Sequence, residues 1–159
     1  MTDRAVAIID LDNIIHNYKI IKSTLRRSCK FMAVVKANAY GHGASTVATV
    51  LEQNGVKHFA VATVEEGIAL RRAGITGDIL ILGYTEGDDC INAILSFNLI
   101  QAVSSPEYAE HLASYGKVRV HIKLDTGMSR LGLYCHNPSD SVSCADTAEK
   151  IYKNPNLSV

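Results

Sequence analysis

Apolar positions along this chain follow two alternating spacings, one typical of helices and one typical of buried strands. Between Leu11 and Leu25 they recur three and four residues apart, which predicts an amphipathic helix that Asp10 or Asp12 can cap. Beyond it, short apolar runs predict strands over 31–36, 58–63, 78–83, 99–103 and 118–124, with 157–159 opening another. Helical patterns separate these runs over 47–54, 65–73, 88–97, 106–115 and 141–153.

Strands that alternate with helices at this spacing favour βαβ units and a parallel sheet. The fold class is therefore α/β, either as a doubly wound sheet or as part of a (β/α)8 barrel of TIM type. The first helix is not opened by a Gly-x-Gly-x-x-Gly sequence, which weakens the dinucleotide-binding option. The pattern by itself leaves both architectures open.

Composition narrows the class of protein. The 159 residues are 47% apolar, which suits one globular domain, and 16 basic residues balance 16 acidic ones, which argues against a nucleic-acid partner. The sequence has no apolar run of roughly 18 residues that could span a membrane, and its first residues, which no apolar core follows, are not expected to act as a signal peptide. Cys29, Cys90, Cys135 and Cys144 lack metal-ligand spacing. We therefore expect a cytoplasmic protein with reduced thiols and no metal site.

One lysine stands out as candidate chemistry. Lys36 ends an apolar run and is followed by a turn-prone segment that contains Tyr40, Gly41, His42 and Gly43. Active sites of open α/β sheets and barrels lie at the carboxyl ends of strands. A partly desolvated lysine at such a position can act as a nucleophile toward a carbonyl. An ordinary surface lysine just past a strand is the alternative.

The segment Val35–Gly43, VKANAYGHG, resembles the pyridoxal-phosphate lysine motif of alanine racemases over its whole length. A second block over 123–132, KLDTGMSRLG, resembles the second signature of that family, and the resemblance extends from about Arg4 to the last residue. It favours the barrel over the doubly wound sheet. It implies a pyridoxal-phosphate-dependent racemase that interconverts L-alanine and D-alanine for peptidoglycan, as a cytoplasmic homodimer.

The resemblance also implies roles for individual residues. Lys36 would bind the cofactor aldehyde and act as the base on one face of the substrate, and the Tyr40 hydroxyl would bind the cofactor phosphate. Leu82 would pack near the cofactor ring. Arg130 would contact the cofactor's phenolic oxygen and the substrate carboxylate, a planar match. Lys123 would be carbamylated, and the resulting anion would accept hydrogen bonds from Arg130 and relieve the repulsion between two cations.

Three neighbours of these residues have expected structural roles. Asp125 and Thr126 are expected to brace the turn before Gly127 rather than to act in catalysis. Ser129 departs from the glycine that many relatives carry, and we expect it to change the stiffness of the turn more than the chemistry.

The length of the chain limits the function that can be expected. A complete barrel of this type takes about 250 residues. We therefore expect residues 1–159 to be the amino-terminal part of the barrel, without the carboxyl-terminal β-domain whose tyrosine supplies the family's opposite-face base. Alone, the chain is expected to be inactive. The alternatives are a racemase for serine or another small amino acid, and a non-catalytic pyridoxal-phosphate-binding barrel.

Overall fold

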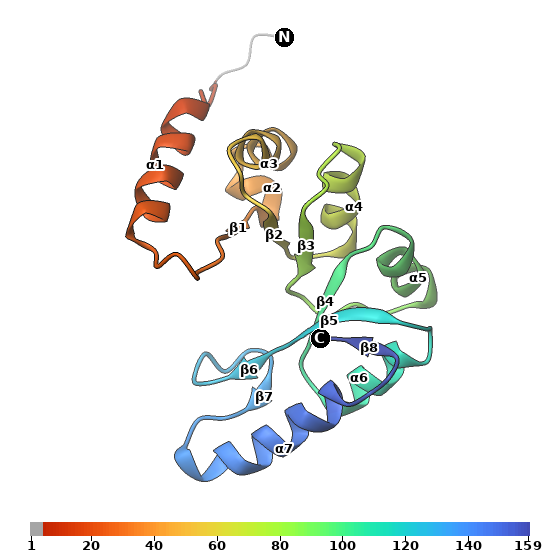
Figure 1. Cartoon of the computed structure of the whole chain (residues 1–159). Helices are drawn as coiled ribbons and strands as arrows, with labels where there is room; N and C mark the ends of the chain where they lie inside the picture. The colour runs from red at the N-terminus through yellow and green to blue at the C-terminus, as the bar shows by residue number, and fades with distance from the viewer. Residues whose placement is uncertain (1–4) are drawn as a thin grey trace.

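In the computed structural model, which describes residues 5–159, helices and strands alternate along the chain (Figure 1). The helices are α1 (Leu11–Thr24), α2 (Lys36–Tyr40), α3 (Ala44–Gln53), α4 (Val64–Arg72), α5 (Asp88–Ser96), α6 (Pro106–Ala113) and α7 (Ser141–Tyr152). The strands are β1 (Met32–Val34), β2 (His58–Val61), β3 (Asp78–Ile81), β4 (Ile100–Val103), β5 (Val118–Ile122), β6 (Leu124–Asp125), β7 (Leu133–Tyr134) and β8 (Leu157–Ser158). The predicted alternation is confirmed, with boundaries that differ by a few residues.

Six of the strands form one sheet in the order β1-β2-β3-β4-β5-β8, and every neighbouring pair is parallel. In Figure 1 the strands curve into an arc, and the helices lie along its outer side. A closed barrel of this type has eight parallel strands, each followed by a helix. The expected fold class, an incomplete (β/α)8 barrel, is confirmed.

Alternation along the strands separates two apolar clusters. In β3, Ile79 and Ile81 are fully buried and join the large core between the sheet and the helices. Leu80 points to the opposite, inner face, where it packs with Ala60, Ile100 and Ala102. The inner face therefore carries its own smaller apolar cluster, which is what a barrel interior requires.

Helix starts follow the capping signals of the sequence. Asp10, rather than Asp12, caps α1, because its Oδ1 accepts a hydrogen bond from the backbone N–H of Asn13 at 3.1 Å. The Ser105 hydroxyl caps α6 by accepting from the N–H of Tyr108 at 3.2 Å, and Pro106 occupies the first helical turn. Both caps fix the point at which the chain leaves the loop before the helix.

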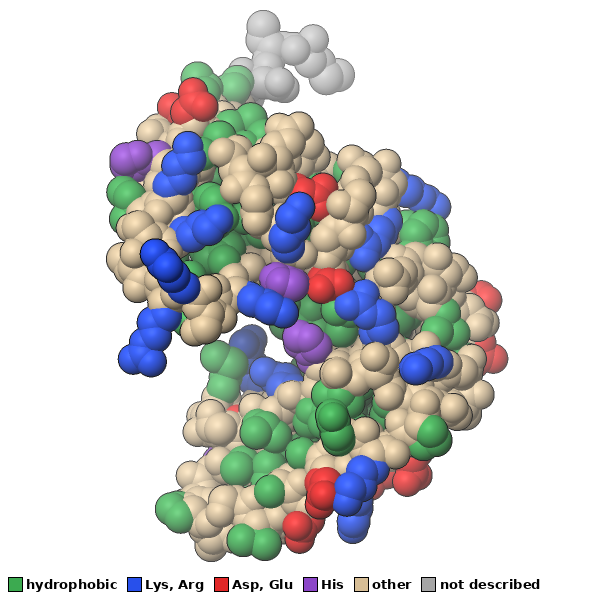
Figure 2. Space-filling view, in the orientation of Figure 1, with side chains coloured by type: hydrophobic (Ala, Val, Ile, Leu, Met, Phe, Trp, Pro, Cys, Tyr) green, Lys and Arg blue, Asp and Glu red, His purple; other side chains and the backbone are tan. Residues whose placement is uncertain are grey.

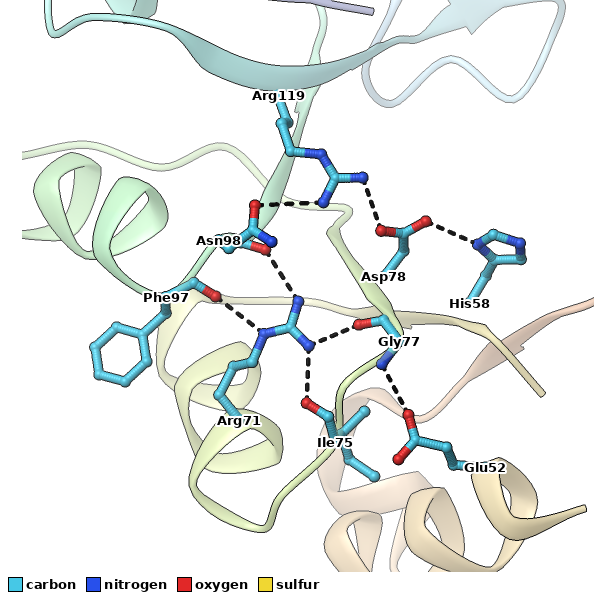
Figure 3. Close-up of polar contacts among 9 residues, drawn as sticks. All are labelled: Glu52, His58, Arg71, Ile75, Gly77, Asp78, Phe97, Asn98 and Arg119. Carbon is cyan, nitrogen blue, oxygen red and sulfur yellow. Dashed lines mark hydrogen bonds and ion pairs between the residues drawn. The ribbon is translucent and has the colours of Figure 1, made fainter. Parts of the chain in front are cut away.

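Arg71 at the end of α4 holds together the loops that precede β3 and β4 (Figure 3). Its Nε donates to the carbonyl of Phe97 at 2.9 Å, and its Nη1 donates to the carbonyls of Ile75 and Gly77 at 2.8 and 2.6 Å. Its Nη2 donates to the carbonyl of Asn98 at 3.0 Å. Burial lowers the pKa of Arg71, a shift that the nearby Asp78 carboxylate opposes. One planar guanidinium thus joins two loops at the amino edge of the sheet.

A second polar group lies on the inner face at the same edge. Asp78 accepts from Arg119 Nη2 at 2.7 Å and contacts Nδ1 of His58 at 3.1 Å (Figure 3). These residues line a hollow of about 330 Å³ with Lys30 and His121. Figure 2 shows basic, acidic and histidine side chains gathered around the hollow in the middle of the molecule. This hollow lies at the starts of the strands, away from Lys36.

Two features of the fold were not predicted. The segment over 118–124 divides at Lys123, so that β5 ends at Ile122 and Leu124–Asp125 pairs with Leu133–Tyr134 in a small separate sheet. The run over 31–36 ends its strand early because Lys36 already belongs to a tight helical turn. Within residues 5–159, no helix combines the length and the apolar character needed to cross a membrane.

Candidate active site

Three of the predicted residues lie at the carboxyl edge of the sheet. Lys36, Leu82 and Lys123 come directly after β1, β3 and β5 or within two residues of the strand end. Leu82 packs against the inner apolar cluster, which places it on the inner face. The alternation of side chains along β5 predicts the same face for Lys123, and Lys36 lies at the start of the turn that follows β1. Both lysines are half-buried.

The backbone that follows Lys36 is a left-handed helical turn. Ala37, Asn38, Ala39 and Tyr40 have φ values of 50, 54, 52 and 53°, and Gly41 has a φ of 90°. A left-handed conformation costs a residue other than glycine about 1–2 kcal/mol. The sequence predicts a turn in this segment, but only Gly41 and Gly43 are residues that favour positive φ. Four consecutive strained residues directly beyond the candidate lysine therefore require specific support from their surroundings.

Several hydrogen bonds supply that support. The carbonyl of Val35 accepts from the N–H of Ala39 at 2.9 Å, and the carbonyl of Asn38 accepts from Gly43 at 2.9 Å. The side-chain oxygen of Asn38 accepts from the first N–H of α3, that of Ala44, at 2.8 Å. The turn is thereby joined to β1 on one side and to α3 on the other. Tyr40, at its end, keeps 62% of its surface exposed.

Glu66 fastens the same turn from helix α4, and sequence reasoning missed it. Its Oε1 accepts from the N–H of Ala37 at 2.7 Å and its Oε2 from the N–H of Ala62, also at 2.7 Å. Thr63 caps α4, so Glu66 stands at the third helical position of a Thr-x-x-Glu sequence. That pattern predicts a helix start. The contact of Glu66 with Ala37, which lies 29 residues away in the sequence, cannot be predicted from this pattern.

The second block places Arg130 on the loop between β6 and β7. Asp125, which is 8% exposed, accepts from the N–H groups of Gly127 and Ser129 at 3.1 and 2.9 Å. Its other oxygen lies 3.1 Å from Nε2 of His136, within the distance of an ion pair. The pKa of Asp125 is lowered to about 2. The largest cause is the hydrogen bond from the N–H of Ser129, and His136 and the N–H of Gly127 contribute as well, whereas desolvation acts in the opposite direction. The expected bracing role of Asp125 is confirmed, whereas His136 was not anticipated.

The predicted site residues share an edge but do not contact one another. Arg130 is exposed, and its Nη2 lies 3.0 Å from the sulfur of Met128. Within residues 5–159, no hydrogen bond or ion pair joins any two of Lys36, Tyr40, Lys123 and Arg130. The arrangement offers an amine, a phenol and a guanidinium at the mouth of the barrel. These groups suit a ligand that carries a carbonyl and anionic substituents.

The fold and this edge define a (β/α)8-barrel protein with its functional groups at the carboxyl ends of the strands. The family model for the N-terminal domain of alanine racemase matches residues 9–159. The chain therefore belongs to the alanine racemase family.

Individual relatives agree with this assignment. An alanine racemase from a Nostoc species is 47% identical over 82% of this chain and 36% of its own length. Alanine racemase 2 of Caldanaerobacter subterraneus is 44% identical over 78% of this chain and 33% of its own. The structure of alanine racemase from Clostridium difficile 630 superposes with a TM-score of 0.83 at 36% identity, and covers 94% of this chain and 41% of that one. The chain thus spans about a third of the length of these curated relatives.

Proposed function

We propose that this chain carries the cofactor-binding lysine of a pyridoxal-phosphate-dependent racemase that interconverts L-alanine and D-alanine. The observation that carries the proposal is Lys36 itself, half-buried at the carboxyl edge of β1 within the segment Val35–Gly43 of an alanine racemase family member. Pyridoxal phosphate, when bound, supplies an aldehyde that condenses with an amine and a ring that accepts the electron pair of the substrate's Cα–H bond.

The residues present fit this cofactor. The amine of Lys36 matches its aldehyde, and the exposed Tyr40 hydroxyl is free to donate to its phosphate. Leu82, seated on the inner apolar cluster, offers an apolar surface to one side of the ring. Arg130 offers a planar pair of donors to a carboxylate or a phenolate oxygen. The donor set thus complements the aldehyde, the phosphate and the phenolic oxygen of the cofactor, and the carboxylate of an amino acid.

The proposed roles follow from these positions. Lys36 would hold the cofactor and, once its amine is released, take the α-proton on Nζ from one face of the substrate, while the proton added on the opposite face would come from a second base; in the reverse direction Nζ would donate to its own face. Arg130 would orient the substrate carboxylate. Lys123 would, as a carbamate, accept hydrogen bonds from Arg130 and so fix its guanidinium.

The base for the opposite face is proposed to come from outside these residues, from a second subunit of a homodimer. We further propose a cytoplasmic location and a role in D-alanine supply for peptidoglycan. The four free cysteines support a reducing compartment.

Another amino acid as substrate is the second candidate. An amino-acid racemase from Enterococcus faecalis is 46% identical over 82% of this chain, and a histidine racemase from Leuconostoc mesenteroides superposes with a TM-score of 0.73 at 29% identity. Both observations favour a racemase whose substrate is chosen by residues other than Lys36. A non-catalytic pyridoxal-phosphate-binding barrel finds less support, because the second block with Lys123 and Arg130 would then have no role.

The experiment incubates the full chain with pyridoxal phosphate and reduces it with borohydride, which fixes the pyridoxyl group to the amine that it has condensed with. Peptide mass spectrometry is expected to find the label on Lys36. Lys36→Ala should abolish saturable labelling, and Lys30→Ala, at an exposed lysine before β1, should not. Equal labelling of many lysines in both variants would contradict the proposal.

A second measurement tests the reaction. In D2O with pyridoxal phosphate, the chain is expected to exchange the α-proton of one alanine enantiomer, because Lys36 serves a single face. Conversion to the other enantiomer is not expected, because the chain alone lacks the base for the opposite face and should be inactive as a racemase. Exchange that persists unchanged in Lys36→Ala would exclude Lys36 as the base. Equal exchange of both enantiomers by the parent chain would exclude a single-face base.

A further inference from the structure

Two backbone N–H groups lose their regular partners where β1 leaves the sheet. The β1–β2 ladder extends as far as the N–H of Val35, which donates to the carbonyl of Ala60 at 2.9 Å. The next bond of a parallel ladder would run from the N–H of Ala62 to the carbonyl of Val35. That carbonyl is taken by the N–H of Ala39, because the chain has entered the left-handed turn. The N–H groups of Ala62 and Ala37 therefore need another acceptor.

The Glu66 carboxylate accepts from both. Its two oxygens receive one bond each, at 2.7 Å, from Ala37 and Ala62. Hydrogen bonds of this length to an ionised acceptor are stronger than those between neutral groups. The carboxylate also lies at the amino end of α4, where the helix dipole favours a negative charge. Glu66 is half-buried, which limits competition from water.

We propose that Glu66 is a positioning residue for Lys36: its carboxylate bridges the carboxyl ends of β1 and β2 and so fixes the backbone on which the lysine is carried. This inference rests on the proposed function of Lys36. Ala37 is the neighbour of Lys36, and it begins the left-handed segment. Release of its N–H would let the first strained residue relax and would change the direction in which the neighbouring Lys36 side chain is held.

Glu65 provides a matched comparison in the same helical turn. It is exposed, and its pKa is lowered by its own backbone N–H and by the hydroxyl of Thr63. It shares the charge and the helix end with Glu66, but not the bonds to Ala37 and Ala62. A change of Glu65 to glutamine therefore removes the same charge without touching the backbone beside Lys36.

The test compares Glu66→Gln with Glu65→Gln in the full chain. The glutamine at 66 keeps one acceptor oxygen but presents an NH2 group to one of the two N–H donors. By NMR, the amide protons of Ala37 and Ala62 are expected to move upfield and to exchange about tenfold faster or more. The pyridoxal phosphate concentration needed for half-maximal borohydride labelling of Lys36 should rise about tenfold. Glu65→Gln should change neither readout.

Three results would overturn the proposal. Unchanged amide signals of Ala37 and Ala62 in Glu66→Gln would show that the two bonds do not hold the turn. Unchanged labelling of Lys36 would show that the bonds do not matter for the lysine. An equal effect of Glu65→Gln would assign the loss to the charge at the helix end. If Glu66→Gln fails to fold, Glu66→Asp, with the charge kept and one methylene removed, should lose one of the two bonds in the same measurements.

The labelling experiment also separates this proposal from the proposed function. Unlabelled Lys36 in the parent chain would overturn the proposed function and the cofactor role of Glu66 together. Labelled Lys36 with equal labelling in Glu66→Gln would overturn the role of Glu66 alone.

Discussion

The carboxylate of Asp125 holds the backbone of Ser129 in a left-handed conformation. Oδ1 of Asp125 accepts from the N–H of Ser129 at 2.9 Å, and Ser129 has a φ of 57°. The expected effect of Ser129 on the stiffness of this turn thus has a structural basis, since a serine adopts this φ less readily than a glycine. Arg130 follows Ser129 directly, so the bond also sets the direction in which the chain enters the arginine.

The first prediction concerns the pH dependence of stability. The pKa of Asp125 is lowered to about 2 in the folded chain, whereas an aspartate in an unfolded chain titrates at about 4. The carboxylate therefore stabilises the fold above about pH 4, and this contribution is lost as the pH falls from about 4 through about 2. Asp125→Asn should be less stable than the parent at neutral pH, and the two should converge near pH 2.

Urea unfolding at stepped pH measures this convergence. Asp146→Asn, at an exposed position on α7, is the matched control and should follow the parent at every pH. If the stability difference between Asp125→Asn and the parent stays constant from neutral pH to pH 2, the prediction is wrong. The difference would then not arise from the negative charge of Asp125.

The second prediction concerns the close approach of two backbone segments at Gly132. A Cβ at this position would lie 2.7 Å from the N of Asp125 and 2.9 Å from the carbonyl carbon of Leu124. Gly132→Ala should therefore separate β6 from β7 and lower the free energy of unfolding by about 2–4 kcal/mol. Gly116 has a similar φ, 126° against 131°, but a Cβ there would meet nothing within 4 Å.

Gly116→Ala is consequently the control that isolates the clash. Like Gly132→Ala, it places an alanine at a strained φ, but it introduces no clash. It should therefore lower the free energy of unfolding by only about 1 kcal/mol. Thermal or urea unfolding of both variants measures the difference. Equal losses would mean that the strained φ, and not the packing of the loop on β6, sets the need for glycine.

Some of these features could be predicted from the sequence, and others could not. The strands and the bracing role of Asp125 could be predicted, because both depend on local signals. These signals are apolar runs and an aspartate, whose short side chain accepts hydrogen bonds, two residues before Gly127. The left-handed turn was not readable, since alanine and tyrosine ordinarily avoid positive φ and only Gly41 and Gly43 indicated it. Glu66 and His136 were missed because each acts on a backbone or a carboxylate that is distant in the sequence, and only the tertiary fold brings them together.

The third prediction concerns Arg71 at the amino edge. Arg71→Lys keeps the charge but replaces the planar guanidinium with a single ammonium, which cannot reach the carbonyls of Phe97, Ile75 and Gly77 at once. We expect a loss of about 1–3 kcal/mol in the free energy of unfolding. Arg72→Lys, at the exposed neighbouring position, should lose less than about 0.5 kcal/mol. A similar loss from both changes would contradict the bridging role of Arg71.

The last prediction concerns Lys123, for which the resemblance implies a carbamate. The amine of Lys123 would condense with CO2, losing a proton, and the resulting anion would face the guanidinium of Arg130. In 13C-enriched bicarbonate, one carbamate carbon signal should appear in the NMR spectrum of the parent chain and vanish on acidification. Lys123→Ala should abolish the signal, and Lys117→Ala, at an exposed lysine just before β5, should preserve it. Arg130→Ala should weaken the signal, because the anion loses its proposed partner. A signal that persists in Lys123→Ala would place the modification on another amine, and the absence of any carbamate signal from the parent chain would contradict the modification of Lys123.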